Sequence, residues 1–247
     1  INGEEVQPYS EQYFDKLIPF ENSGIFFKKV IQLQNKMIKG ENLMQYLTAA
    51  TVTDEMPFGQ NLPLHPMPNR SSEYIRNEAS IAVLDSLEQY VIPALKSYNE
   101  EYQFYRDLVN EEELRSPAYK EIVESLDMVA LRAQHRAATM QYLIDYRKSQ
   151  INNDKLAEKK ALTNLETAKN IRAKGIEIVR SRESKYRYPV NELATKRPDH
   201  TSYHFGYLFP VHDLHFWERE EGQALNNKWK FWYKNIWNVW RIIGIVE

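Results

Sequence analysis

The chain has 247 residues, no cysteine, 27% charged residues and a formal net charge of −2 at pH 7. Without cysteine, disulfides, zinc–thiolate sites, iron–sulfur clusters and a cysteine nucleophile are excluded. The balanced charge argues against a bulk nucleic-acid binder, which needs a cationic face.

The first residues, 1–20, are polar with scattered aromatic side chains, and we interpret them as an extended N-terminal arm. Ser23 is a candidate N-cap for a first long helix, in which apolar residues recur at steps of three and four. Gly40 weakens this helix midway. The apolar positions are Phe26, Phe27, Val30, Leu33, Met37, Met44 and Leu47.

Residues 51–71 contain Pro57, Pro63, Pro66 and Pro68, which forbid a continuous helix and predict an extended connector packed on a surface. A second helix is predicted to begin at Ser72 and to run to about residue 98. Its Pro93 predicts a kink. The acidic residues 99–114 either extend this helix or form its frayed end.

A third helix is predicted after Ser116, because the following proline suits the first helical position. Its apolar residues alternate steps of three and four for almost four heptads, which is typical of a coiled-coil seam. The sequence Asn152-Asn153-Asp154 predicts a turn and a cap, and a fourth helix follows over residues 155–185. This short turn favours antiparallel pairing of the third and fourth helices.

The composition changes after Tyr188-Pro189, and residues 186–247 hold all five tryptophans and four of the six histidines. We expect a strand or extended segment over residues 203–209, a helix over residues 212–223 and a further helix over residues 227–243. Tryptophan and tyrosine mixed with lysine and arginine suit a protein interface, a membrane surface or a cap on the core. The candidate interface residues are Trp229, Trp232, Tyr233, Trp237 and Trp240.

The expected fold is therefore mainly α, an elongated antiparallel helical bundle or helical hairpin with an extended N-terminal arm and an aromatic-rich C-terminal extension. The expected organisation is an arm over 1–20, a helical bundle over 21–186 that includes the connector, and an aromatic-rich docking region over 187–247.

Motifs that carry chemistry are few. The isolated glycines form no phosphate-binding loop, and neither the paired-histidine zinc motif nor a nucleophile elbow occurs. His212, His215 and Glu218 would lie along one helical face and are candidate metal ligands, although packing roles are the commoner reading in so aromatic a sequence. The carboxylate pairs Glu218 with Glu221 and Glu121 with Glu124 are weak candidates for acid–base catalysis.

Arg132, His135 and Arg136 lie beside the seam of the third helix. They would form a basic rim that binds an anionic partner or, more commonly, a surface row of salt bridges that contributes little. We expect the latter.

These features favour a non-catalytic accessory subunit of a larger, membrane-associated assembly, such as a mitochondrial ATP synthase or respiratory complex. Its expected partners are other protein subunits with peripheral lipid contact, without nucleic acid and without a cofactor. The expected location is the mitochondrial inner-membrane periphery, and a chain that begins at Ile1 fits a removed presequence. The alternatives are an extracytoplasmic bacterial helical ligand-binding protein, periplasmic or at the cell surface, and a metalloenzyme using residues 200–218.

Overall fold

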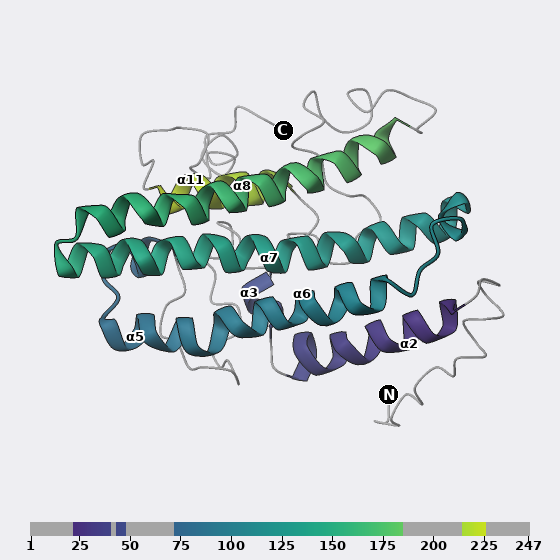
Figure 1. Ribbon diagram of the computed structural model, residues 1–247, viewed down its shortest axis with the longest axis horizontal. Helices are drawn as coiled ribbons and strands as arrows, with labels where there is room; N and C mark the ends of the chain where they lie inside the picture. The colour runs from purple at the N-terminus through teal and green to yellow at the C-terminus, as the bar shows by residue number, and fades with distance from the viewer. Residues whose placement is uncertain (1–21, 41–42, 48–71, 185–213, 226–247) are drawn as a thin grey trace, which may run out of the picture.

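The computed structural model describes residues 22–40, 43–47, 72–184 and 214–225. Within these ranges the regular structure is entirely helical, which confirms the prediction of a mainly α fold. The longest helices lie roughly side by side along one axis of the molecule (Figure 1).

The centre of the fold is a pair of antiparallel helices, α7 (Pro117–Asn152) and α8 (Lys155–Glu183). The chain reverses at Asn153, whose φ of 54° lies in the left-handed region. The Asp154 carboxylate then accepts hydrogen bonds from the backbone N–H groups of Leu156 at 3.0 Å and Ala157 at 2.9 Å. Both features of this turn agree with the sequence prediction.

A second antiparallel layer lies along the other side of α7 (Figure 1). It consists of α5 (Ile81–Ser86), the π-helical turn η2 (Leu87–Val91) and α6 (Ile92–Arg106). The wide η2 turn ends two residues before Pro93, which lies in the first turn of α6, and a proline inside a continuous α-helix would clash with the carbonyl four residues earlier. The Tyr102 hydroxyl on α6 donates a hydrogen bond of 2.8 Å to Asp127 on α7, which ties the layers together.

Two predicted long helices are interrupted. The helix expected over residues 23–47 is α2 (Ser23–Leu33), followed by the π-helical η1 (Gln34–Gly40) and, after a gap, α3 (Met44–Leu47). The helix expected from Ser72 stops as α4 (Ser72–Asn77), and Ser80 caps a new start by accepting from the backbone N–H of Val83. The apolar spacing continues through both breaks, so the pattern alone did not reveal them.

Burial of α7 extends beyond its apolar residues to several polar ones. Its buried residues include apolar side chains such as Val129 and Ala133, and also the polar side chains of Arg132, His135 and Thr139. Arg132 and His135 contact the last described helix, α11 (Leu214–Ala224), which lies against α7 and α8, whereas the Thr139 hydroxyl donates to the His135 carbonyl within α7. A 3₁₀ turn, η3 (Glu113–Arg115), leads into the start of α7.

Several predictions lie outside the described residues: the N-terminal arm, the Pro-rich connector, the extended segment over 203–209 and the aromatic helix over 227–243. The helix expected over residues 212–223 is present as α11. Among the helices that the structure describes, none is long and apolar enough to cross a membrane.

Candidate functional site

Helix α11 is held on the α7–α8 hairpin through one buried face. Leu214, Trp217, Glu220, Glu221 and Ala224 are all buried, and their spacing of three and four is that of one helical face. The apolar half of this face packs with Met128 and Val179, and the other half carries two carboxylates into the protein. A helix of 11 residues is too short to be stable alone, so these contacts determine whether α11 forms.

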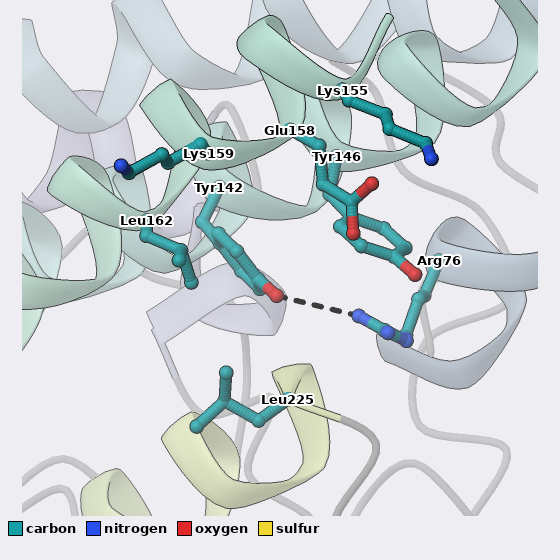
Figure 2. Close-up of a pocket in the computed structure, with 8 residues that line it drawn as sticks. All are labelled: Arg76, Tyr142, Tyr146, Lys155, Glu158, Lys159, Leu162 and Leu225. Atoms are coloured by element: carbon teal, nitrogen blue, oxygen red, sulfur yellow. Dashed lines mark hydrogen bonds between the residues drawn. The ribbon is translucent and has the colours of Figure 1, made fainter. Parts of the chain in front are cut away.

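A pocket of about 350 Å³ lies at the C-terminal end of α11 (Figure 2). Its wall includes Leu225, which directly follows α11, and residues of α4, α7 and the beginning of α8. The full lining is Arg76, Tyr142, Tyr146, Lys155, Glu158, Lys159, Leu162 and Leu225. The pocket therefore depends on the position of α11.

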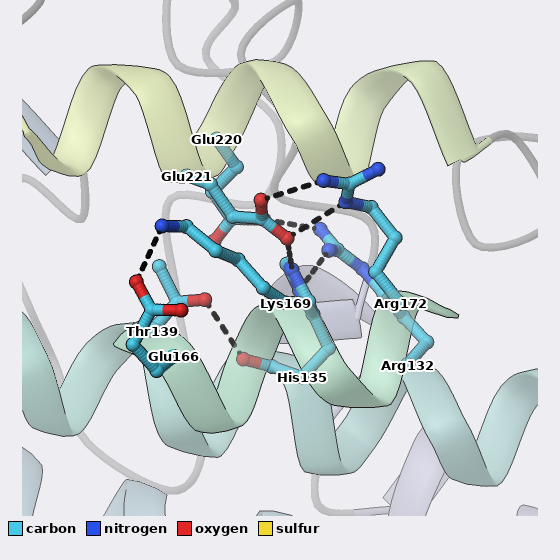
Figure 3. Close-up of polar contacts among 8 residues, drawn as sticks. All are labelled: Arg132, His135, Thr139, Glu166, Lys169, Arg172, Glu220 and Glu221. Carbon is cyan, nitrogen blue, oxygen red and sulfur yellow. Dashed lines mark hydrogen bonds and ion pairs between the residues drawn. The ribbon is translucent and has the colours of Figure 1, made fainter. Parts of the chain in front are cut away.

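The two carboxylates of α11 meet three arginines inside the protein (Figure 3 draws Arg132 and Arg172). Glu220 forms ion pairs with Arg132 at 2.7 Å and with Arg136. Glu221 accepts two hydrogen bonds from Arg172, from Nε at 2.9 Å and from Nη2 at 3.1 Å. We call these five residues, together with His135, the buried ionic cluster.

The cluster also connects distant parts of the chain. The Nε of Arg132 donates a hydrogen bond of 2.9 Å to the carbonyl oxygen of Leu47 at the end of α3. The guanidinium carbon of Arg132 lies 5.5 Å from the ring centroid of Trp217, and the His135 ring lies 5.1 Å from the same tryptophan. One arginine of α7 thus contacts α3 and two residues of α11.

His135 is held in its neutral form. Arginine can only donate, so the contact of 2.9 Å between Arg132 Nη1 and His135 Nδ1 makes Nδ1 an acceptor. The proton then resides on Nε2, which donates to Glu221 at 3.0 Å. Burial, followed by the nearby positive charges of Arg132 and Arg136, lowers the pKa of His135 to about 4 despite the opposing effect of Glu221.

The prediction of a surface row at Arg132, His135 and Arg136 is wrong. Arg132 and His135 are 0% exposed and Arg136 is 3% exposed, because α8 and α11 cover the face of α7 that the seam leaves free. One sequence feature could have indicated this. Neither arginine has an acidic residue three or four positions away, so each needs a partner distant in the chain.

Three of the four weak catalytic candidates, Glu121, Glu124 and Glu221, are engaged in ion pairs. Glu221 binds Arg172, Glu121 pairs with Arg182, and Glu124 lies 3.4 Å from Lys120. Burial acts to raise the pKa of Glu221, but the hydrogen bond from His135 and then the hydrogen bonds and charge of Arg172 outweigh it and hold the pKa below its usual value. This arrangement favours a permanently charged structural carboxylate at Glu221.

Only two of the three candidate metal ligands lie within the described residues. His215 and Glu218 lie on α11, whereas His212 precedes the described range. In the part of the chain that the structure describes, no three histidine, aspartate or glutamate side chains gather as a metal site would require. The candidate interface residues Trp229, Trp232, Tyr233, Trp237 and Trp240 all lie beyond residue 225, outside the described residues.

Close packing between α8 and α11 yields a first prediction. A Cβ added at Gly175 would lie 3.0 Å from Leu214 Cδ2 and 3.6 Å from the Trp217 ring. Gly175→Leu should therefore displace α11 while favouring helix in α8, and overpacking of this kind costs about 1–3 kcal/mol. We expect the backbone amides of residues 214–224 to exchange hydrogen at least about tenfold faster than in the parent protein.

The matched control is Lys174→Leu, at an exposed position of the same helix. It should leave the exchange of α11 unchanged. Equal protection of α11 in the Gly175→Leu variant and the parent would contradict the close packing of the two helices.

No protein-family model, curated protein or solved structure matches this chain.

Proposed function

We propose that this protein is a non-catalytic docking subunit, in which α11 holds the aromatic C-terminal segment, residues 226–247, in position for a protein partner. The observation that carries the proposal is the buried ionic cluster that attaches α11 to the α7–α8 hairpin. The segment begins directly after the last described residue, Leu225.

The chemistry of the attachment favours a positioning role. Buried ion pairs bring little net stability, because desolvation of the charges offsets their attraction, but they can specify one arrangement over others. Apolar contacts alone would tolerate sliding of α11 along the hairpin. The pairing of Glu220 with Arg132 and Arg136, and of Glu221 with Arg172, gives α11 one register.

The end of α11 is also anchored. Arg76 of α4 donates a hydrogen bond of 2.9 Å to the carbonyl oxygen of Ala224, the last residue of α11. The last residue of α11 is therefore held in place, and a fixed attachment point reduces the entropy that a binding element loses when it meets its partner.

The composition of residues 226–247 suits recognition of a protein. It contains four tryptophans, and tryptophan, tyrosine and arginine are the residues that most commonly dominate the binding energy of interfaces. The fifth, Trp217, belongs to the core. Assignment to a mitochondrial ATP synthase or respiratory complex, and the inner-membrane location, stay predictions from the sequence.

This proposal predicts the association behaviour of the isolated chain. Without its partner the protein should self-associate through the aromatic segment, and Trp232→Ala with Trp237→Ala should return it to a monomer. Loss of anchor residues typically costs at least about 2 kcal/mol, so the dissociation constant should rise about thirtyfold or more. Sedimentation velocity of the full chain measures both states.

The control is Phe104→Ala, because Phe104 on α6 is a highly exposed aromatic residue, with 70% of its surface accessible. This change should leave self-association as it is. A parent protein that sediments as a single monomeric species across micromolar concentrations would argue against the docking role.

A further inference from the structure

The pocket at the end of α11 has the features of an anion-binding site. Three positively charged side chains line it, Arg76, Lys155 and Lys159, against the single carboxylate of Glu158. The lining thus carries an excess of two positive charges. Its volume of about 350 Å³ is within the usual range for small-molecule sites.

Arg76 is held in place by its neighbours. Its guanidinium carbon lies 3.8 Å from the centroid of the Tyr146 ring, and its Nη1 donates to the Ala224 carbonyl at 2.9 Å. A longer contact of 3.4 Å reaches the Tyr142 hydroxyl (Figure 2). The Nε of Arg76 is buried and has no hydrogen-bond partner among the described residues, so a ligand in the pocket would meet the guanidinium at its Nη groups.

The two lysines of the pocket lie near the N-terminus of α8, where a positive charge is electrostatically unfavourable. Lys155 and Lys159 occupy the first two turns of α8, next to the positive end of the helix dipole, where acidic residues are stabilising. Neither lysine forms an ion pair with any residue that the structure describes. The carboxylate of Asp154 caps the backbone at this end of α8, and Glu158, the one acid in the lining, accepts a hydrogen bond of 3.0 Å from Gln150. A bound anion would neutralise this concentration of positive charge.

The remaining lining is apolar and aromatic. The rings of Tyr142 and Tyr146 lie 5.9 Å apart, and Leu162, which is 43% exposed, and Leu225 complete the wall. These side chains suit a flat or aliphatic group attached to the anion. A dianion matches the excess charge better than a single carboxylate does, and arginine with lysine is a common combination for phosphate.

We propose that this pocket binds a small phosphomonoester whose organic part is aromatic or aliphatic, with Arg76, Lys155 and Lys159 around the phosphate and Tyr142, Tyr146 and Leu162 beside the organic part. This role is independent of the docking function and uses none of the residues beyond position 225. Leu225 lines the site and the Ala224 carbonyl accepts a hydrogen bond from Arg76, so binding should also stabilise the packing of α11 on the hairpin.

The test is titration calorimetry of the full chain with phenyl phosphate, inorganic phosphate and benzoate as probes. We expect phenyl phosphate to bind at least about tenfold more tightly than either of the others, because only it satisfies both halves of the pocket. The double variant Lys155→Gln with Lys159→Gln should weaken phenyl phosphate at least about tenfold.

The matched control is Lys160→Gln with Lys174→Gln, which removes the same charge from exposed positions of α8 outside the pocket. Its affinity should stay within about twofold of the parent value, since exposed charges at this distance are screened by salt. Absence of phenyl phosphate binding at millimolar concentrations, or equal weakening in both double variants, would overturn the proposal. Both lysine pairs are exposed or half-exposed, so neither variant should prevent folding.

Discussion

Replacement of Glu220 by alanine should lower the free energy of unfolding by about 3–5 kcal/mol, the usual cost of breaking a buried ion pair. Glu220 is 1% exposed and is paired with Arg132 and Arg136, which are also buried. Without it, two guanidinium groups would remain in the interior with only Glu221 to balance three arginines. The cost arises from the uncompensated charge, so it should far exceed that of an exposed glutamate.

Urea denaturation followed by circular dichroism measures this change. The control Glu177→Ala removes an exposed carboxylate from α8 and should shift stability by less than about 0.5 kcal/mol. A second variant separates charge from packing: Arg132→Met, Arg136→Met and Glu220→Leu together should recover most of the lost stability. A loss below about 1 kcal/mol for Glu220→Ala would contradict the structural role of the pairing.

The second large effect is acid sensitivity set by His135. Its pKa is about 4 in the folded protein, against about 6.5 in an unfolded chain. Between about pH 4 and 6.5, His135 is therefore mostly protonated in the unfolded state and mostly neutral in the folded state. Stability should rise with pH between about 4 and 6.5, be fully present above 6.5, and differ by about 3 kcal/mol across this window. Glu221 adds a loss at lower pH, because its pKa is also depressed by folding.

The His135→Gln variant removes the titrating group and should flatten the dependence of unfolding free energy on pH within this window. Nuclear magnetic resonance of the imidazole provides an independent measurement, with a midpoint expected near pH 4. A midpoint near 6.5 in the folded protein, or an unchanged slope in the variant, would show that His135 is not buried in its neutral form.

The helices could be predicted from the sequence because helix caps and apolar spacing depend on residues that are close together in the chain. Ser116 before Pro117 correctly marked the start of α7, and Asp154 correctly marked the cap of α8. The wide turns η1 and η2 and the break before Ser80 were missed, since apolar spacing of three and four changes little when one residue is added to a turn.

The buried ionic cluster could not be assembled from sequence, because its partners are far apart in the chain. Arg132 and Glu220 are separated by more than eighty residues, and their pairing depends on how α11 packs. The sequence shows that Arg132 and Arg136 have no acidic residue three or four positions away. This absence indicates that each needs a distant partner but does not identify that partner. The pocket is lined by residues of α4, α7 and α8 and by Leu225, and these segments are too far apart in the chain to form a recognisable sequence pattern.

The cluster and the pocket lie at successive places along α11. Glu220 and Glu221 fix its register, and Ala224 and Leu225 connect it to Arg76 and the pocket wall. A change that releases α11 should therefore affect both the proposed phosphomonoester site and the attachment of the proposed docking segment. Gly175→Leu and Glu220→Ala are expected to share this property, whereas Trp232→Ala should leave the pocket intact.

Affinity purification of the tagged full chain from its native cells tests most directly the proposal that the protein docks through residues 226–247. In mild detergent the parent chain should co-purify in stoichiometric amount with a larger complex, and the Trp232→Ala, Trp237→Ala variant should lose it while Phe104→Ala retains it. Recovery of the parent chain as a lone monomer, or retention of the complex by the tryptophan variant, would contradict the claim.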